Sequence, residues 1–517
     1  MFQHLKETTP TGLGCMCLVS IGAFLFGFDN GWWGTIQGAE AFLQAFGHCE
    51  TAGDSSSCSL TASQASAGSS VQSAAIMVAS IFAVYINKAL GRKLSLVVTG
   101  VISIVGILIE ITSGIGCPRF AQFVVGKTVA SIAMGLCANI VPIYLSETST
   151  DAARGFAINM YQNVQIIGYC LAAGVVYASA KRADAGSYLI PIGLQLFAPL
   201  LMILLSPLLP ESPRWLVWNG RRNDAIHAAS CLFKTNSNNF DAEMYVRELE
   251  IAFEKELAHP DASTWKDLSH GPDLRRLLIS MGIQCWMQAQ GSGYIINYMV
   301  SFLQDSGTSN VFPFIMGLNF VYYGGILTGH FLPDRYGRRP VVLSSTIANA
   351  AFMLTIASIN TAISPATSSS GAASVAFLFL WQLSSGVMSP LIWIICTEAA
   401  PTRNRERVLS LAIFVGFGVS LMITSVSPYL QDKGYGGLGS RIGFIWGAAS
   451  VLTTIWSFFM VPETKGLSLE QIDSCYEQSL SARKFDQRDL GNIEVVDGNP
   501  VLLGNVEDIE DGIAKKP

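Results

Sequence analysis

Charged residues are scarce in this chain: they make up 13% of its 517 residues, whereas hydrophobic residues make up 50%. Soluble domains carry about 25% charged residues, and a soluble chain of this length divides into several domains that each need a polar surface. The composition therefore excludes an ordinary soluble protein. The formal net charge of −5 leaves no basic face, so we expect no nucleic-acid partner.

Other features are also missing. No nucleophile–base pair and no cluster of metal ligands stands out, so we expect neither an enzyme nor a metal or cofactor. No signal cleavage site is evident, which indicates that the first apolar segment is retained as an anchor. Most of the 11 cysteines lie in apolar segments, where a thiol packs like a small hydrophobic group. Cys49 and Cys58 lie instead in a Ser-rich polar segment, and a disulfide between them requires that segment to be outside the cell.

Long apolar segments are abundant. A membrane-spanning helix needs about 20 mainly apolar residues. Twelve segments meet this condition, at 13–36, 68–88, 94–114, 120–143, 156–179, 187–209, 277–303, 311–332, 340–362, 373–396, 408–430 and 442–461. The sequence thus predicts an all-α membrane protein with twelve transmembrane helices.

Lys and Arg residues are unevenly divided between the loops of the two sides. One set of loops carries 5 of them and the other carries 19, of which 9 lie in one long loop. Positive residues mark the cytoplasmic side of a membrane protein. We therefore expect both termini in the cytoplasm and the Cys49 and Cys58 segment outside. The plasma membrane is the expected location.

The predicted organisation has five parts: a cytoplasmic N-terminal segment (1–12), a six-helix half (13–209), a cytoplasmic linker (210–276), a second six-helix half (277–461) and a cytoplasmic tail (462–517). In the linker, "NDAIHAASCLF" and "DAEMYVRELEIAFEKEL" carry apolar residues at helical spacing, which predicts short amphipathic helices. The tail ends in the acidic "NVEDIEDGIAKKP" and is expected to be largely disordered.

Three motifs occur twice. "LGRK" at 90–93 recurs as "YGRR" at 336–339, "SETSTDAARG" at 146–155 recurs loosely as "TEAAPTRNRERV" at 397–408, and "PESPRWL" at 210–216 recurs as "PETKGLS" at 462–468. The offsets of 246, 251 and 252 residues are nearly equal. This pattern is typical of two halves related by an axis along the membrane normal, with a substrate site between them near the midplane.

These motifs, with "DRYGRR" and an Asp in the first apolar segment, resemble those of the sugar porter family of the major facilitator superfamily. The short extracellular and cytoplasmic inserts resemble those of fungal hexose transporters. The resemblance covers nearly the whole chain. It implies the major facilitator fold and a monomeric transporter, in lipid, that moves a monosaccharide, most simply a hexose, with proton symport. Departures from the family pattern keep alternatives open: a proton-independent facilitator, a transporter or exporter of another small polar metabolite (a polyol, oligosaccharide, organic acid or secondary metabolite), or a sensor.

The resemblance also implies a salt-bridge lock at the cytoplasmic mouth, closed when the cavity is open outward and broken when it opens inward. The candidate members are Glu147, Arg154, Glu211, Arg214, Asp334, Arg335, Arg338, Glu398, Arg405 and Glu463. The alternative is that these are solvated charges that only set topology. Asn87 stands where the family usually has Asp, so we expect the copy in the first half to be weaker.

Asp29 lies in "FGFDNGWWG", inside the first apolar segment. A carboxylate at membrane depth costs about 2.5–3.5 kcal/mol on insertion scales, which indicates a function and a partner. In proton-coupled relatives the acid at this position pairs with an Arg on the fourth helix, and the matching residue here is Lys127. The resemblance thus implies an Asp29–Lys127 pair for proton coupling; a neutral, hydrogen-bonded acid is the alternative. Glu110, near the outer end of the third segment, is expected to be exposed.

Sugar hydroxyls donate and accept hydrogen bonds, as amide side chains do. The resemblance implies Gln162, Gln288 and Trp393 as substrate ligands. Met287 and Gly293 replace two family ligands, and an expected Asn is missing from "LAIFVGFGVSL". The candidate replacements are Asn297, Asn319, Gln165 and Gln290. For each amide the alternative is a hydrogen bond between helices, worth about 0.6 kcal/mol.

Overall fold

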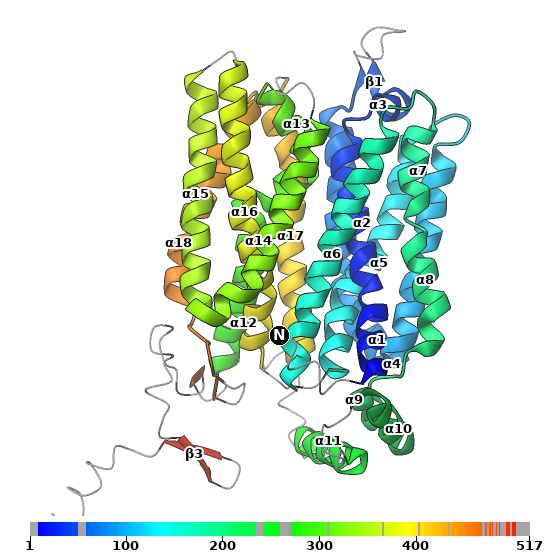
Figure 1. Ribbon diagram of the computed structural model, residues 1–517, viewed down its shortest axis with the longest axis vertical. Helices are drawn as coiled ribbons and strands as arrows, with labels where there is room; N and C mark the ends of the chain where they lie inside the picture. The colour runs from blue at the N-terminus through cyan, green and yellow to red at the C-terminus, as the bar shows by residue number, and fades with distance from the viewer. Residues whose placement is uncertain are drawn as a thin grey trace, which may run out of the picture.

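The computed structural model (Figure 1) describes most of the chain. The described residues are 9–49, 58–149, 151–233, 241–258, 268, 270–307, 311–363, 367–401, 404–432, 434–467, 471–472, 475–476, 478, 482, 485, 493–496 and 499–502.

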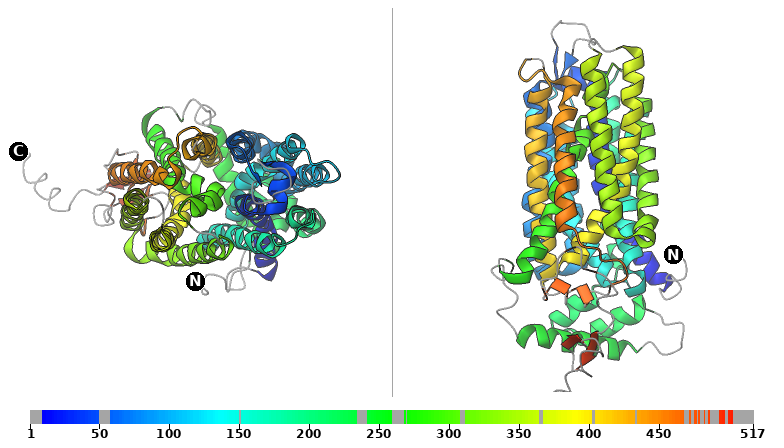
Figure 2. Two further views of the ribbon diagram at one scale, coloured as in Figure 1. Left: turned by 90° about the horizontal axis from the view of Figure 1, so that it is seen from above. Right: turned by 90° about the vertical axis from the view of Figure 1, so that its left-hand side faces the viewer.

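Two bundles of long helices stand side by side (Figures 1 and 2). The N-terminal half contains α1 (Pro10–Val19), α2 (Ile21–Ile36), α4 (Ala62–Ser113), α5 (Phe120–Glu147), α6 (Asp151–Ser179), α7 (Gly186–Leu194), α8 (Phe197–Leu205) and the short η3 (Ser206–Leu208). The C-terminal half contains α12 (Gly271–Met287), the π-helical η6 (Gln288–Ser292), α13 (Gly293–Asp305), α14 (Phe312–Tyr336), α15 (Arg338–Ala362), α16 (Ser368–Ala399), α17 (Arg405–Gln431), η8 (Gly439–Ile442) and α18 (Gly443–Met460).

Each of the twelve predicted segments lies on these helices. Two of them, 68–88 and 94–114, share α4, which is kinked at Gly91, where φ is 82°. Within the described part of the chain, eight helices are long and apolar enough to cross a membrane by length and composition. The helices α6, α13 and α14 are not among these eight. Two of them, α6 and α14, carry several of the polar residues that line the space between the halves, as described below.

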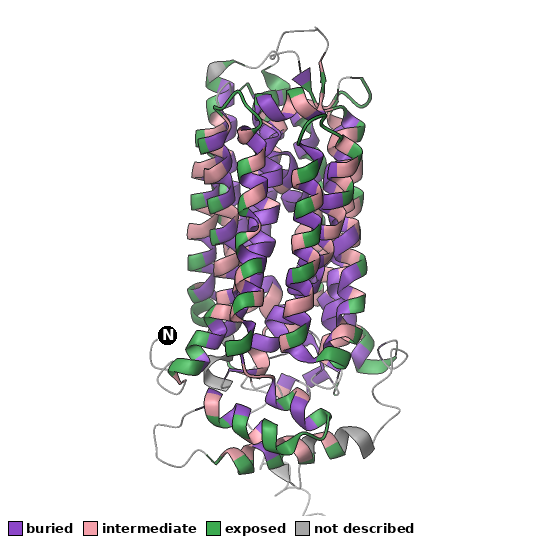
Figure 3. Cartoon of the chain, turned by 90° about the vertical axis from the view of Figure 1, so that its right-hand side faces the viewer, coloured by how far each residue is buried: buried purple, intermediate pink, exposed green. Residues whose placement is uncertain are grey.

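The outer surface of the bundle is apolar. Large side chains such as Phe82, Phe197 and Leu204 are 58%, 58% and 70% exposed. In Figure 3, exposed positions recur along the outer flanks of the helices, while buried positions face inward. An apolar surface of this extent requires lipid around it.

The two ends of the bundle carry different elements (Figure 1). At the end that we call the linker end lie α9 (Pro213–Trp218), α10 (Arg222–Leu232) and α11 (Ala242–Ala258). The last two coincide with the two helices predicted for the linker, whereas α9 was not predicted. At the opposite, hairpin end, α3 (Glu40–Phe46) precedes the strands β1 (His48–Cys49) and β2 (Cys58–Ser59), which a Cys49–Cys58 disulfide joins. The strands β3 (Ile493–Val496) and β4 (Asn499–Leu502) form a second hairpin within the predicted tail, most of which lies outside the described residues.

Candidate functional site

A cavity of about 600 Å³ lies between the two halves. Four helices supply most of its wall: α2 and α6 from one half, α14 and α16 from the other, with η6 and α13 beside them. The lining residues are Gly27, Asn30, Gln162, Gln165, Ile166, Tyr169, Ser292, Ile295, Ile296, Asn319, Tyr322, Trp381, Gln382 and Ser385. All of these side chains are uncharged, and the polar ones are amides, hydroxyls and an indole. The cavity is therefore suited to a neutral molecule rich in hydroxyl groups.

Several buried polar atoms in this wall have no hydrogen-bond partner within the described part of the protein. They are Gln162 Oε1, Gln165 Oε1, Asn319 Nδ2, Trp381 Nε1 and Ser385 Oγ. Buried polar groups are normally paired, so such a cluster indicates a place for water or a ligand. Two of the atoms accept, two donate, and the hydroxyl does both.

Of the predicted substrate residues, Gln162 and Asn319 line this cavity, as does Gln165. Gln162 also connects the halves, because its Nε2 donates to Ser389 Oγ at 2.8 Å. It therefore holds one hydrogen bond to α16 while its carbonyl oxygen faces the cavity unpaired.

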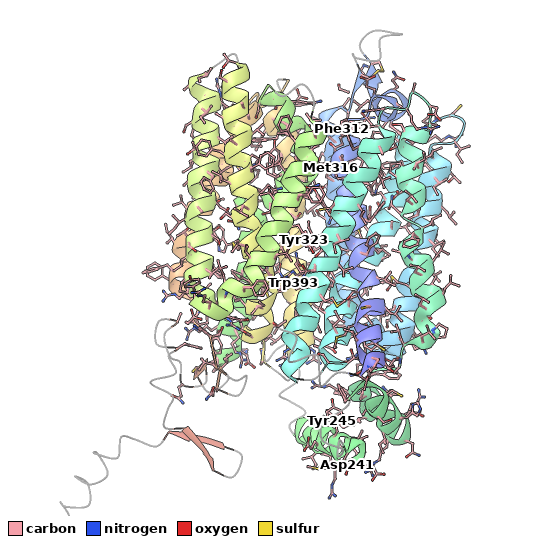
Figure 4. The ribbon with its side chains drawn as sticks, in the orientation of Figure 1. Asp241, Tyr245, Phe312, Met316, Tyr323 and Trp393 are labelled. Atoms are coloured by element: carbon pink, nitrogen blue, oxygen red, sulfur yellow. A yellow bond between two sulfur atoms is a disulfide. The ribbon has the colours of Figure 1, made fainter. Side chains whose placement is uncertain are left out.

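The cavity wall does not include Gln288, Asn297 or Trp393. The Asn297 amide donates to Gly293 O at 2.9 Å, within its own helix. Trp393 packs edge-to-face on Tyr161, with ring centroids 5.7 Å apart. In Figure 4 it lies nearer the linker end than Tyr323. Gln290, another candidate replacement, accepts a hydrogen bond from Asn349 Nδ2 at 3.0 Å and is not part of the cavity wall.

Sequence reasoning missed several wall residues, namely Asn30, Tyr169, Ser292, Tyr322, Trp381, Gln382 and Ser385. Spacing provides a signal for some of them. Gln162, Gln165 and Tyr169 follow one another at three- and four-residue intervals, so they share one face of α6. Trp381 and Ser385 have the same relationship on α16.

The structure brings Asp29 and Lys127 together beside this cavity. Lys127 Nζ lies 3.4 Å from Asp29 Oδ1, and the two side chains are 0% and 5% exposed. Trp32 Nε1 donates to the same carboxylate oxygen at 3.0 Å. The ammonium also lies over the rings of Trp32 and Trp33, 5.2 and 5.1 Å from their centroids. Trp32 and Trp33 thus contact the ion pair, because residues three and four positions after Asp29 lie on the same face of the helix.

The expectation that Glu110 is exposed was wrong: its side chain is fully buried, at 0%. Close packing of α4 on α5 is the reason. A Cβ atom at Gly126 would lie only 2.8 Å from Glu110 Cγ, so the carboxyl side chain is pressed against the backbone next to Lys127.

At the linker end, Arg92 connects the two halves. Its Nη2 lies 2.8 Å from Glu147 in its own half and 2.6 Å from Glu406 on α17 of the other half. Neither Arg92 nor Glu406 was among the predicted members of the lock. The repeat provides a signal for Arg92: "LGRK" matches "YGRR", so Arg92 occupies the position equivalent to that of Arg338.

Glu211 and Glu463 have equivalent roles within their own halves. Glu211 Oε1 accepts from the backbone N–H of Arg92 at 2.9 Å, and Glu463 Oε1 accepts from that of Arg338 at 2.9 Å. Each carboxylate thus caps the helix segment that begins after a glycine, Gly91 or Gly337, with φ of 82° and 102°. A Cβ at either glycine would collide with that carboxylate. Burial raises the pKa of Glu211 above its ordinary value, and the N–H donors oppose this shift.

The other predicted members of the lock lie at the same level. Arg338 pairs with Glu398 at 3.2 Å and with Asp334 at 3.4 Å, all within the C-terminal half. Arg335 lies over the ring of Tyr336. The side chain of Arg154 lies outside the described part.

A second cavity, of about 990 Å³, lies at the linker end, and its wall includes Arg214, Arg405, Arg92, Glu147 and Glu406. Asn87, at the departure from the family pattern, is buried and donates to Asn139 Oδ1 at 3.2 Å.

Comparison with known proteins agrees with this architecture. Residues 15–476 match the family model described as "Sugar (and other) transporter". The chain is 29% identical over 481 residues to the major facilitator-type transporter ecdD of Aspergillus rugulosus, covering 90% of this chain and 87% of that one. It is 27% identical to the probable glucose transporter rco-3 of Neurospora crassa, covering 92% and 82%.

Among solved structures, the proton:xylose symporter XylE bound to 6-bromo-6-deoxy-D-glucose superposes with a TM-score of 0.74 at 18% identity, over 90% of this chain and 99% of that one. Two helical halves, a polar cavity between them and a family match over most of the length lead to one conclusion. The chain belongs to the sugar transporter family of the major facilitator superfamily, and it is a multi-pass membrane transporter rather than an enzyme.

Proposed function

We propose that this protein moves a neutral monosaccharide, a hexose, across the plasma membrane by alternating access, together with a proton carried by Asp29. The linker end then faces the cytoplasm, with both termini, and the hairpin end faces outside. The proposal takes a single chain as the working unit.

The cluster of unpaired polar atoms in the cavity is the observation that carries this proposal. Gln162 and Gln165 offer acceptors, Asn319 and Trp381 offer donors, and Ser385 offers both. A hexose presents hydroxyl groups of matching character. The cavity wall has no cationic side chain to pair with a carboxylate, which disfavours an organic acid as the substrate. Relatives point the same way, since they include a probable glucose transporter and a xylose symporter.

Contacts between the halves on both sides of the cavity support alternating access. At the linker end, Arg92 pairs with Glu406, and Asn139 Nδ2 donates to Ser410 Oγ at 2.7 Å. At the hairpin end, Gln37 Nε2 donates to Asn297 O at 2.8 Å. If one set breaks while the other holds, the cavity opens to one side at a time.

The position of Asp29 supports proton coupling. Its neighbours Gly27 and Asn30 line the cavity, whereas Asp29 itself faces Lys127 on α5. A shift of α2 that accompanies substrate binding therefore also changes the distance between the carboxylate and the ammonium. Substrate and proton are coupled if both favour the same arrangement.

Uptake into proteoliposomes tests the proposal. Labelled D-glucose and D-xylose are offered with and without an imposed inward proton gradient, and with a protonophore as control. We expect accumulation that requires the gradient, and we expect Asp29→Asn to abolish accumulation while downhill flux continues. Wild-type flux that ignores the gradient would reject the symport and leave a facilitator.

A second candidate is a transporter of another polyol or of a secondary metabolite. It is favoured by the absence of Gln288, Asn297 and Trp393 from the cavity wall, since the hexose assignment by resemblance relied on two of them. A panel of labelled polyols in the same vesicles distinguishes the two: uptake of a polyol without uptake of either sugar would select the second candidate.

A further inference from the structure

A third ionisable group accompanies the Asp29–Lys127 pair. Glu110 on α4 is 0% exposed, and it interacts electrostatically with both Asp29 and Lys127. The three groups come from α2, α4 and α5, all in the N-terminal half. The mechanism proposed above does not use Glu110, although a buried acid inside a membrane protein requires an explanation.

The helices α4 and α5 pack closely around Glu110. A Cβ at Gly106 would lie 2.3 Å from the backbone nitrogen of Ala130, and one at Gly126 would lie 2.8 Å from Glu110 Cγ. Glycines at both positions therefore allow α4 and α5 to approach until the glutamate lies beside Lys127. The side chain has no exposed area in this arrangement.

The two carboxyl groups have unequal hydrogen-bond partners. Asp29 Oδ1 accepts hydrogen bonds from Trp32 Nε1 at 3.0 Å and from Lys127 Nζ at 3.4 Å. Glu110 Oε2 accepts one hydrogen bond, from the Gln195 amide at 3.4 Å, and Oε1 has no partner among the residues that the structure describes. An ionised carboxylate needs its oxygens paired far more than a neutral acid does. The partners therefore fit an ionised Asp29 and a neutral Glu110.

The charged and polar groups that surround Glu110 agree with one ionised and one neutral acid. Asp29 comes from α2, Lys127 from α5, and Gln195 from the junction of α7 and α8. Tyr188 on α7 lies nearby, but its hydroxyl donates to Gly114 O at 3.2 Å. With both acids ionised, two negative charges share one ammonium in a dry site, and the uncompensated charge is strongly disfavoured. One proton on the pair makes the cluster neutral.

We propose that Glu110 is a second proton-binding site, which exchanges one proton with Asp29 as Lys127 moves between them. When the ammonium turns from Asp29 toward Glu110, the O–H bond of Glu110 breaks and an O–H bond forms on Asp29, so the total charge of the cluster is unchanged. Glu110 lies three residues before the end of α4 at the hairpin end, whereas Asp29 lies seven residues before the end of α2. The glutamate is thus the outer of the two proton sites. This role rests on the proton symport proposed above.

Infrared spectroscopy tests the protonation without any substrate. The purified protein in lipid nanodiscs at pH 7 is compared with Glu110→Gln, and with Glu40→Gln as the control at an exposed glutamate on α3. We expect a carboxylic-acid C=O band that shifts on labelling with ¹³C-glutamate, is lost in Glu110→Gln and is kept in Glu40→Gln. The band should also be lost in Asp29→Asn, because Glu110 then becomes the ionised partner of Lys127. A Glu110→Gln spectrum identical to wild type would overturn the proposal.

Transport separates this inference from the proposed function. Under an imposed proton gradient, Glu110→Gln should lose accumulation of labelled D-glucose, and Glu110→Asp should restore part of it. If wild type accumulates the sugar and Glu110→Gln does so with the same dependence on external pH, Glu110 has no role in coupling and the symport stands. If wild type ignores the gradient, the symport and the role of Glu110 in coupling fail together, and the infrared band then reports only on the static charge of the cluster.

Discussion

Arg92 on α4 and Glu406 on α17 form an ion pair of 2.6 Å between the two halves of the bundle. Its counterpart in the repeat, Arg338, pairs within its own half with Asp334 and Glu398. The two copies of the motif are therefore not equivalent. The expectation that the first copy is the weaker one, based on Asn87, stays a prediction, although this copy makes the contact between the halves.

Removing the charge of Glu406 should favour opening at the linker end. Glu406→Gln keeps the side-chain shape but weakens a pair in which the glutamate is 33% exposed, so we expect a loss of about 1 kcal/mol, or about a fivefold change in the open population. The measurement is the rate at which an impermeant thiol reagent labels a cysteine introduced at Ser385, in the cavity, from the linker side. Glu250→Gln removes a pair with Arg222 in which the glutamate is equally exposed but both partners lie in the linker; it is the matched control and should leave the rate unchanged. Equal rates in all three proteins would show that the Arg92 contact does not hold the halves together.

The two glutamines predicted from the family should differ in effect. Gln162→Ala removes a cavity-lining amide together with its hydrogen bond to Ser389, so we expect the transport KM for the sugar to rise about ten- to a hundredfold. Gln288→Ala should change KM by less than about threefold, since Gln288 is not in the wall. Initial rates of uptake at equal surface expression provide both values. Equal losses in the two variants would mean that the sugar does not bind in this cavity.

Lys127 should be needed for stability as well as for coupling. Lys127→Met leaves the buried Asp29 carboxylate with Trp32 alone, and breaking a buried pair in this way costs about 3–5 kcal/mol. The double variant Asp29→Asn/Lys127→Met should recover most of that loss. Thermal unfolding in detergent, followed by tryptophan fluorescence, compares these proteins with Lys181→Met at an exposed site. If Lys127→Met unfolds at the same temperature as the Lys181→Met control, the Asp29–Lys127 pair does not stabilise the protein.

A native cysteine reports on topology. Cys117 is free and exposed in the loop between α4 and α5, at the hairpin end. If that end lies outside the cell, an impermeant thiol reagent should label it on intact cells, and Cys117→Ser should remove the signal. Labelling that appears only after the membrane is permeabilised would reverse the proposed orientation.

Local sequence was sufficient for the elements of this fold. Each predicted apolar segment is helical, and the two amphipathic patterns of the linker correspond to α10 and α11, because the length and spacing of apolar residues favour helix formation in lipid and at its surface. The repeated motifs identified two related halves. Asp29 and Lys127 were assigned to each other by resemblance, and the structure places them 3.4 Å apart.

Tertiary structure alone decided which polar side chains reach the cavity. Trp381 and Trp393 lie on the same helix, but only the first lines the wall, since that depends on where α16 crosses α6 and α14. The π-helical turn η6, with Gly291 at φ 108°, inserts an extra residue per turn and changes the face that follows it. Asn297, which follows this turn, therefore faces a different direction from the one that an unbroken helix would give it. Glu110 is buried for a related reason: Gly106 and Gly126 let α4 and α5 pack closely, and such an approach between two helices leaves no mark in the periodicity of either one.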